Sequence, residues 1–287
     1  MDATSEYIVE RGKVAGDIRC VLAEQGFKEV MTPVLRDGDC LVNRRYQTTG
    51  GQYLRDCYEL PVRRLVSQEL PKVFALGPCF RPNDENDATH LQEFYMAAIY
   101  SLGESIDVMK EITEEILRKV IPWAVESKVI SMRDFIKEDL GIDIAVESTE
   151  TLVKKLFEKY HYSETARAHV IVDTYIERVI EPLMTGIDSI YFLTDYPTCT
   201  MSISARVNGL NYLKRFECFI DGLEIGHASV GCLDPDDMEQ RLAYADMLGP
   251  EEQEQIGLLR AGLIKPNVGY GLGVDRLCMI RLRNGGK

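Results

Sequence analysis

Apolar side chains recur at helical spacing in two parts of the chain, one near its start and one after Gly103. In both parts the apolar positions lie one to four residues apart, which is typical of a helix with one buried face. The two sets are Val14, Ile18, Val21 and Leu22, then Ile106, Met109, Ile112, Ile116 and Val120. Because proline cannot continue a helix, we expect the second helix to end before Pro122.

Apolar and β-branched runs bounded by turn residues predict strands elsewhere in the chain. These runs are residues 72–81, 93–102, 189–197, 215–231 and the start of 267–282. The stretch 26–35 also suggests a short apolar strand, but it contains Pro33. Because proline cannot donate to a strand ladder, this segment belongs at a sheet edge or an interface.

The order of these elements favours an α+β fold. Helical patterns dominate the front and middle of the chain, including the charged residues 126–186, whereas strands surround an acidic loop and fill the last third. This order predicts an antiparallel sheet flanked by helices and not a βαβ series. No repeat, low-complexity segment or Pro/Gly/Ser-rich linker interrupts the 287 residues, so we expect a single domain over 1–287.

Charge and composition narrow the range of partners. The chain has 33 Lys and Arg against 46 Asp and Glu, a formal net charge of −13, so a nucleic acid would have to dock on a locally basic patch. No apolar run is long enough to span a membrane and the N-terminus does not resemble a signal peptide, which predicts a cytoplasmic protein without membrane contact. Eight cysteines without a CxxC pair argue against structural zinc.

The dipeptide Asp221–Gly222 predicts a two-residue hairpin turn. Such a turn pairs Phe219 with Glu224, so Glu217 shares a sheet face with Glu224. Two neighbouring carboxylates repel each other unless a cation lies between them, and Mg²⁺ bound to a nucleotide phosphate is a common solution. From the spacing alone, a solvated face with two ordinary surface acids is an equally good interpretation.

The glycines of "GYGLGVDRL", residues 269–277, suggest a phosphate loop at first sight. A dinucleotide-binding fingerprint needs a following βαβ unit, and too few residues remain for one. We therefore expect the glycines to thin a strand so that a ligand can lie flat on its backbone. Arg276, on the following helix, would reach that ligand.

Taken together, these segments resemble the catalytic core of class II aminoacyl-tRNA synthetases, in the lysyl or class IIb branch. The segments "GFKEVMTPVL", "FRPNDENDATHLQEF" and "GYGLGVDRL" are similar to motifs 1, 2 and 3. The flanking segments "YLRDCYELPVRRLV", "TDYPTCTMSISAR" and "RFECFIDGLEIG" match the lysyl branch in order and spacing. "GPCFR" and "LEIGHASVG" also resemble pyrrolysyl-tRNA synthetase.

The resemblance implies roles for particular residues, with ATP and Mg²⁺ as cofactors. Arg81 would bind the α-phosphate and the amino-acid carboxylate, and Arg276 would lie near adenine and the γ-phosphate; both would be catalytic. Glu217 and Glu224 would hold Mg²⁺. The other implied ATP-binding residues are Asn83, His90, Phe94 and Gly273, where Phe94 would stack on adenine and His90 would contact the outer phosphates. Plain structural roles for Phe94 and His90 stay open.

The implied amino-acid pocket differs from that of a lysine enzyme. Gly231 and Ala98 stand where the lysyl branch has acids, so Glu59 is the one acid that remains, with Tyr100 and His227 beside it. A lysine ammonium would find too little negative charge there, so we expect a neutral, bulkier or differently charged amino acid.

The motif 2 loop suggests an acceptor other than RNA. In synthetases this loop meets the acceptor end of tRNA, but here Asp84, Glu85 and Asp87 place negative charge against phosphate and Thr89 replaces a usual arginine. An ordinary solvated turn is the alternative. The resemblance also includes no anticodon-binding domain.

We therefore expect an ATP- and Mg²⁺-dependent ligase that activates an amino acid as its adenylate. The predicted acceptor is a protein amine or small-molecule amine, as in stand-alone lysyl-tRNA synthetase paralogues. One alternative is a compact, pyrrolysyl-like synthetase that charges a tRNA, which a basic patch elsewhere would favour. Another is a non-catalytic regulatory paralogue, although the four charged residues of the implied ATP site argue against it. The motif 1 segment predicts a homodimer.

Overall fold

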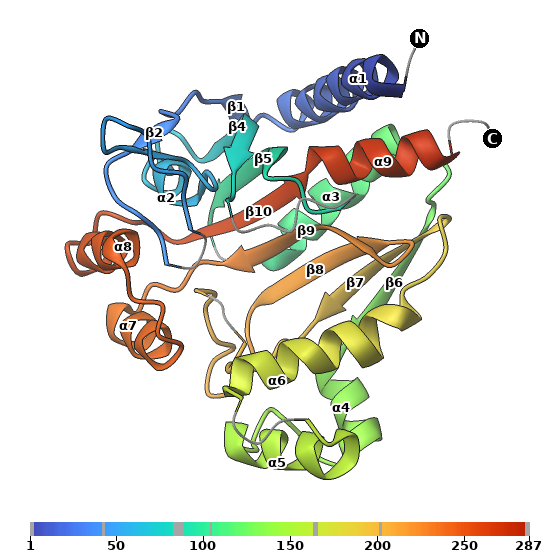
Figure 1. Ribbon diagram of the computed structural model, residues 1–287, viewed down its shortest axis with the longest axis vertical. Coiled ribbons are helices and arrows are strands. Elements are labelled where there is room, and N and C mark those ends of the chain that lie inside the picture. Colours follow the sequence, from blue (N-terminus) through green and yellow to red (C-terminus); the bar gives the residue numbers. More distant parts are fainter. Residues whose placement is uncertain are drawn as a thin grey trace.

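The computed structural model describes residues 3–41, 44–82, 89–103, 105–162, 166–200 and 203–284. Its centre is an eight-stranded sheet in the order β1-β4-β5-β10-β9-β8-β7-β6 (Figure 1). Every neighbouring pair is antiparallel except the two outermost pairs, β1 with β4 and β6 with β7. The predicted α+β fold with a mostly antiparallel sheet is confirmed.

The strands coincide with most of the predicted runs. Their bounds are β1 Lys28–Glu29, β4 Lys72–Phe80, β5 Glu93–Leu102, β6 Glu126–Ser131, β7 Ser189–Thr194, β8 Arg215–Ile220, β9 Leu223–Val230 and β10 Asn267–Gly273. The β8–β9 turn has φ values of 52° at Asp221 and 72° at Gly222, as the type I′ geometry of a tight hairpin requires.

One face of the sheet is covered by α1 (Ala3–Glu24), α3 (Ile106–Val120) and α9 (Val274–Asn284) (Figure 1). The apolar positions that predicted the first two helices are buried in this layer, where Val14, Ile18 and Met109 are fully inaccessible. The second helix ends at Val120, two residues before Pro122, as predicted. This layer leaves the opposite face of the central strands available for a site.

Residues 126–186 form a smaller, mostly helical part beside β7 and β8, at the lower end of the sheet in Figure 1. It contains β6, α4 (Met132–Leu140), α5 (Thr149–Tyr160), α6 (Ala168–Tyr175), a π-helical turn at Ile176–Ile180 and a 3-10 turn at Glu181–Leu183. A separate cluster of buried apolar residues holds these elements together. The predicted helical character of this part is confirmed, and the strand β6 is an element that the sequence did not predict.

The stretch 26–35 does not form the single apolar strand that its composition suggests. Only Lys28–Glu29 joins the large sheet, as an edge strand, whereas β2 (Leu35–Arg36) pairs with β3 (Tyr53–Leu54) in a separate two-stranded sheet. The residues between β1 and β2 are irregular. Pro33 explains the interruption, because it has no N–H with which to continue a ladder.

Three further helices were not predicted from the sequence: α2 (Glu59–Arg63), α7 (Pro235–Tyr244) and α8 (Pro250–Arg260). Local signals for α7 and α8 were present. The Asp234 side chain accepts hydrogen bonds from the backbone N–H groups of Asp236 and Asp237, and Pro occupies the first turn of both helices.

Candidate active site

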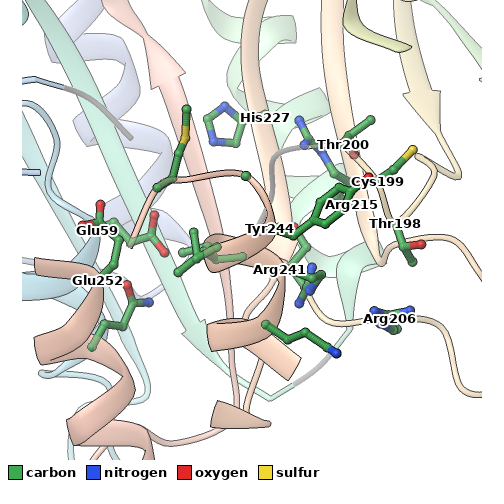
Figure 2. Close-up of a pocket in the computed structure, with 18 of the residues that line it drawn as sticks. Glu59, Thr198, Cys199, Thr200, Arg206, Arg215, His227, Arg241, Tyr244 and Glu252 are labelled. Carbon is green, nitrogen blue, oxygen red and sulfur yellow. The ribbon is translucent and has the colours of Figure 1, made fainter. Parts of the chain in front are cut away.

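A cavity of about 930 Å³ opens against the central strands, between α2, α7, α8 and residues from 198–200 and 203–206. On β8, Phe216 and Cys218 point into the core beneath α3, so the alternating Glu217 faces the other way, into the cavity. Figure 2 shows that the two sides of the cavity differ in charge. Glu59 and Glu252 lie on one side, and Arg206 and Arg215 lie on the other.

Arg81 directly follows β4 and lines the cavity. Its backbone N–H donates to the carbonyl of Gln92, and its guanidinium lies 4.9 Å from the centroid of the Phe94 ring, which steadies the side chain. Its Nε is buried and has no hydrogen-bond partner among the described residues. A buried guanidinium nitrogen without a partner is costly, so this atom suits an anionic ligand.

Arg276 joins three parts of the fold. From α9, its Nη1 donates to the backbone carbonyl of Glu224 at 2.6 Å and lies 3.4 Å from the Glu224 carboxylate, while Nε donates to the carbonyl of Thr89 at 3.3 Å. Thr89 Oγ1 in turn lies 3.1 Å from Nδ1 of the exposed His90. Arg276 thus ties the end of the motif 2 loop to the β8–β9 hairpin.

The hairpin brings its two carboxylates to the cavity, as predicted. The expected pairing of Phe219 with Glu224 is present, but the register then shifts and places His227 opposite Glu217. The shift lets His227 Nδ1 approach the Glu224 carboxylate to 3.6 Å. Sequence reasoning missed this irregularity because the turn fixes only the first pairs of the ladder.

The pKa values of the two acids are shifted in opposite directions. Burial raises the pKa of Glu217, and the negative charge of Glu224 adds to the rise. Arg215, which forms an ion pair with Glu217, opposes it. Burial also raises the pKa of Glu224, but His227, Arg276 and Arg215 outweigh it, so the net shift is downward. The charge of Glu224 acts on Glu217, and such like-charge repulsion is relieved when a cation binds to both carboxylates.

A second, smaller cavity of about 280 Å³ lies beside Glu217 and was not predicted from the sequence. Asp173 and Glu181 line it together with Glu217. Burial, with the charges of Glu217 and Glu224, raises the pKa of Glu181 to about 7. Burial raises the pKa of Asp173 to about 6, against the lowering effect of Arg215. Both residues lie in the helical part between β6 and β7, whose pattern gives no sign of such proximity.

The amino-acid end of the cavity is only partly as predicted. Glu59 and His227 line it, but Ala98, Tyr100 and Gly231 are missing from the described residues that do so. Arg63 occupies the space next to Gly231 instead. Its side chain is 1% exposed, and its Nη1 donates to Glu59 at 3.2 Å. Burial raises the pKa of Glu59, while Arg63 and His227 oppose the rise.

Glycines serve close packing at this end and not a flat-lying ligand. A Cβ atom added at Gly231 would lie 2.5 Å from Nη2 of Arg63. One added at Gly269 would lie 2.3 Å from the ring of Tyr100. The expectation that a ligand covers the β10 backbone therefore fails at Gly269, because an aromatic side chain of the protein already covers it. At Gly273 the nearest atom to an added Cβ is 3.5 Å away, an ordinary contact.

The basic side of the cavity was also missed by sequence reasoning. Arg206 and Arg241 both pair with Asp237, at 2.9 and 2.8 Å, so two cations share one carboxylate. Tyr244 lies near Arg215 and Arg241 and is 65% exposed (Figure 2). Two of the predicted features, Asn83 and the acids Asp84, Glu85 and Asp87, lie outside the described residues.

Comparisons with known proteins identify the family of this chain. Residues 2–284 match the family model described as tRNA synthetases class II (D, K and N), and the chain belongs to that family. Its relatives include the lysine–tRNA ligase of Saccharolobus solfataricus, 27% identical over 96% of this chain and 61% of the relative. Lysine–tRNA ligase 2 of Methanosarcina mazei is 30% identical over 96% of this chain and 59% of the relative. The corresponding values for the lysine–tRNA ligase of Thermotoga maritima are 28%, 97% and 60%.

The predicted membership of the lysyl class II branch is thereby confirmed. The chain spans about three fifths of the length of these curated relatives. Within the described residues, no helix combines the length and the apolar character needed to cross a bilayer.

Proposed function

We propose that this chain activates an amino acid with ATP as its aminoacyl-adenylate and transfers the aminoacyl group to a tRNA. The observation that carries the proposal is Arg81, which lines the same cavity as Glu217 and Glu224 and whose buried Nε has no hydrogen-bond partner among the described residues. A cation and two carboxylates in one cavity suit a substrate with a carboxylate, a phosphate chain and a bound metal.

In the proposed reaction, a carboxylate oxygen of the amino acid attacks the α-phosphorus of ATP. The bond from that phosphorus to the bridging oxygen breaks, and pyrophosphate leaves with the electron pair. Such an in-line displacement depends on positioning and charge stabilisation more than on proton transfer. Arg81 would hold the reacting carboxylate and α-phosphate, and Arg276, fixed by Glu224 and Thr89, would neutralise the outer phosphates.

The carboxylates of Glu217 and Glu224 fit Mg²⁺, which prefers oxygen ligands and retains several waters. When bound, the metal would neutralise charge on the leaving phosphates. Arg215 pairs with Glu217, and Arg276 and His227 lie against Glu224, so a bound metal would share both carboxylates with these side chains. Phe94 is proposed to stack on adenine and His90 to contact the outer phosphates.

We propose tRNA as the acceptor because of the names of the relatives. The curated relatives are named lysine–tRNA ligases, so the predicted protein or small-molecule amine acceptor lacks support and the tRNA alternative fits better. The cavity wall offers some support for this alternative, because Arg206 and Arg241 share the single carboxylate of Asp237 there. Positive side chains of this kind can attract an acceptor phosphate even though the net charge is −13.

Pyrophosphate exchange with a broad panel of amino acids tests the first half of the proposal. Exchange that depends on one amino acid and on Mg²⁺ is expected. Incubation with total tRNA at physiological salt tests the second half, where a periodate-sensitive aminoacyl-tRNA is expected. Exchange without any charging would return the acceptor to a protein or small-molecule amine, and no exchange at all would contradict adenylate formation.

We also propose a homodimer built on the motif 1 segment. Met31 is 96% exposed in the irregular residues that follow the edge strand β1, and Val34 and Leu35 further along the segment are also exposed. Exposed apolar residues next to a sheet edge favour association with a second copy. Sedimentation at micromolar concentration is expected to give a dimer that Met31→Asp shifts to monomer. A wild-type monomer would contradict this interface.

A further inference from the structure

His227 lies on β9 beside the two proposed metal ligands, and the proposed reaction gives it no role. In the register of the sheet it is directly opposite Glu217 of β8. Residues that are directly opposite point to the same face of a sheet, with Cβ atoms about 5 Å apart, so the imidazole shares a face with the Glu217 carboxylate. Both side chains line the cavity, as does Glu224. We call Glu217, Glu224 and His227 the hairpin cluster.

The imidazole is close enough to Glu224 to bind the same ion. Nδ1 of His227 lies 3.6 Å from a carboxylate oxygen of Glu224. Neighbouring ligands of a six-coordinate ion with metal–ligand distances of about 2.1 Å lie roughly 3 Å apart. The two ligand atoms therefore need to approach each other by less than about 1 Å to hold one ion.

The hairpin cluster is open to the cavity. The side chain of His227 is 52% exposed, and those of Glu217 and Glu224 are 16% and 34% exposed. Gly271 of β10 is paired with His227 on its other side. A Cβ atom added at Gly271 would lie 3.7 Å from Cε1 and 4.0 Å from Nε2 of the imidazole, so a longer side chain there would crowd the ring. An ion can therefore reach the cluster from the cavity.

Arginine side chains already meet part of the charge of the two acids. Arg215 forms an ion pair with Glu217, and Arg276 lies 3.4 Å from the Glu224 carboxylate. Because these arginines repel a cation, charge attraction holds a divalent ion less strongly here than at two carboxylates alone. A nitrogen ligand adds binding that does not depend on negative charge. Mg²⁺ prefers oxygen ligands and retains its waters, whereas transition ions accept imidazole.

We propose that His227 is a third ligand of the metal site and that the hairpin cluster binds a divalent transition ion such as Mn²⁺ in preference to Mg²⁺. The inference rests on the proposed function, since it takes Glu217 and Glu224 as the metal ligands of adenylate formation. Mg²⁺ would bind through the two carboxylates, whereas Mn²⁺ would also bind Nδ1 of the neutral imidazole.

Mn²⁺ binding to the whole protein tests the cluster without relying on turnover. Electron paramagnetic resonance of the protein with Mn²⁺ and the unreactive nucleotide α,β-methylene-ATP is expected to show coupling to a directly bound nitrogen. Labelling the histidines with ¹⁵N separates an imidazole nitrogen from those of adenine, because only the imidazole coupling changes with the label. A spectrum that the label leaves unchanged would overturn the inference.

His227→Gln keeps a polar side chain but removes the imidazole. Titrations that follow free Mn²⁺, with Mg²⁺ as the competitor, are expected to show at least about a tenfold loss of Mn²⁺ affinity and less than about a threefold change for Mg²⁺. His161→Asn is the matched control. His161 is exposed and follows α5 in the left-handed conformation, which Asn adopts readily, so this change should alter neither affinity.

An unchanged Mn²⁺ affinity in His227→Gln, or equal losses for both ions, would overturn the inference while the proposed function stands. A wild-type protein that does not bind Mn²⁺ would overturn it as well. Failure of pyrophosphate exchange with every amino acid would instead remove the proposed function. Imidazole coupling in the Mn²⁺ spectrum would then still establish the hairpin cluster as a metal site.

Discussion

The two ends of the cavity follow different rules. At the proposed phosphate end, Arg81, Glu217 and Glu224 line the cavity and Arg276 contacts Glu224, whereas His90, Phe94 and Gly273 are not among the described lining residues. At the proposed amino-acid end, Glu59, His227 and Arg81 line the cavity, whereas Ala98, Tyr100 and Gly231 are not among the described lining residues. The first end is built from strands and a tight turn with fixed periodicity. The second depends on how the long side chain of Arg63 packs beneath Glu59.

In the proposed assignment, adenylate chemistry and the choice of amino acid therefore depend on different parts of the fold. The phosphate end uses charges fixed by backbone neighbours, such as the bond from Arg276 to the Glu224 carbonyl. The amino-acid end uses a glycine whose missing side chain is replaced by Arg63. Substitutions at the two ends should therefore affect different kinetic constants.

The largest expected effect is at the phosphate end. Glu224→Gln keeps the shape of the side chain but removes the charge that is proposed to hold Mg²⁺. We expect pyrophosphate exchange to fall by at least about 100-fold, chiefly in kcat, because the charge on the leaving phosphates loses its stabilisation. Glu254→Gln, an exposed acid on α8, should leave exchange unchanged. Full activity in Glu224→Gln would make the hairpin acids an ordinary solvated pair.

A smaller, separable effect is expected at the amino-acid end. In Gly231→Ala the new methyl group would meet Arg63 at 2.5 Å, so the guanidinium must move away from Glu59. Overpacking of this kind costs about 1 to 3 kcal/mol of stability. We expect the KM for the amino acid to rise about tenfold while the KM for ATP stays within twofold. Equal changes in both constants would show that the two ends are coupled.

The control for Gly231→Ala is Gly257→Ala on α8, where nothing lies within 4 Å of the added carbon. That change should stabilise the helix slightly, by less than about 1 kcal/mol, and leave both KM values alone.

The smallest effect on activity is expected from a substitution of Asp139, which lies in the helical part, away from both ends of the cavity. Its carboxylate accepts from Lys159 at 2.6 Å, Tyr160 at 2.8 Å and Tyr175 at 2.9 Å. Burial raises the pKa of Asp139, but these three bonds outweigh it and lower the pKa. Asp139→Asn should cost about 1 to 2 kcal/mol of unfolding free energy at pH 7 and leave exchange unchanged.

The pH dependence of that cost follows from the lowered pKa. A carboxylate with a lowered pKa in the folded state stabilises above its unfolded pKa, near 4, and loses this contribution as the pH falls through its folded pKa. Urea titrations should therefore show the gap between wild type and Asp139→Asn shrinking below about pH 4. A constant gap would mean that packing, and not charge, accounts for it. Glu138→Gln, an exposed neighbour, serves as the control.

Periodicity and turn chemistry were sufficient for much of the fold and for the phosphate end. The spacing of Val14 and Ile18 predicted α1, and the Asp221–Gly222 turn placed Glu224 on the face of Glu217. These features are local, because a helix or hairpin relates residues a few positions apart. The resemblance to class II synthetases then supplied the chemistry that local patterns leave open between a metal site and a solvated face.

Tertiary structure alone decided the rest. Asp56 and Gln255 lie about two hundred positions apart in the sequence, yet both line the same cavity, and Glu181 and Glu217 line the smaller cavity although the helical pattern around Glu181 gave no sign of it. Arg63 closes the expected pocket because Gly231, just after β9, leaves room for its guanidinium. Such contacts depend on how whole elements pack, and a side chain's charge or size predicts them only after its neighbours in space are known.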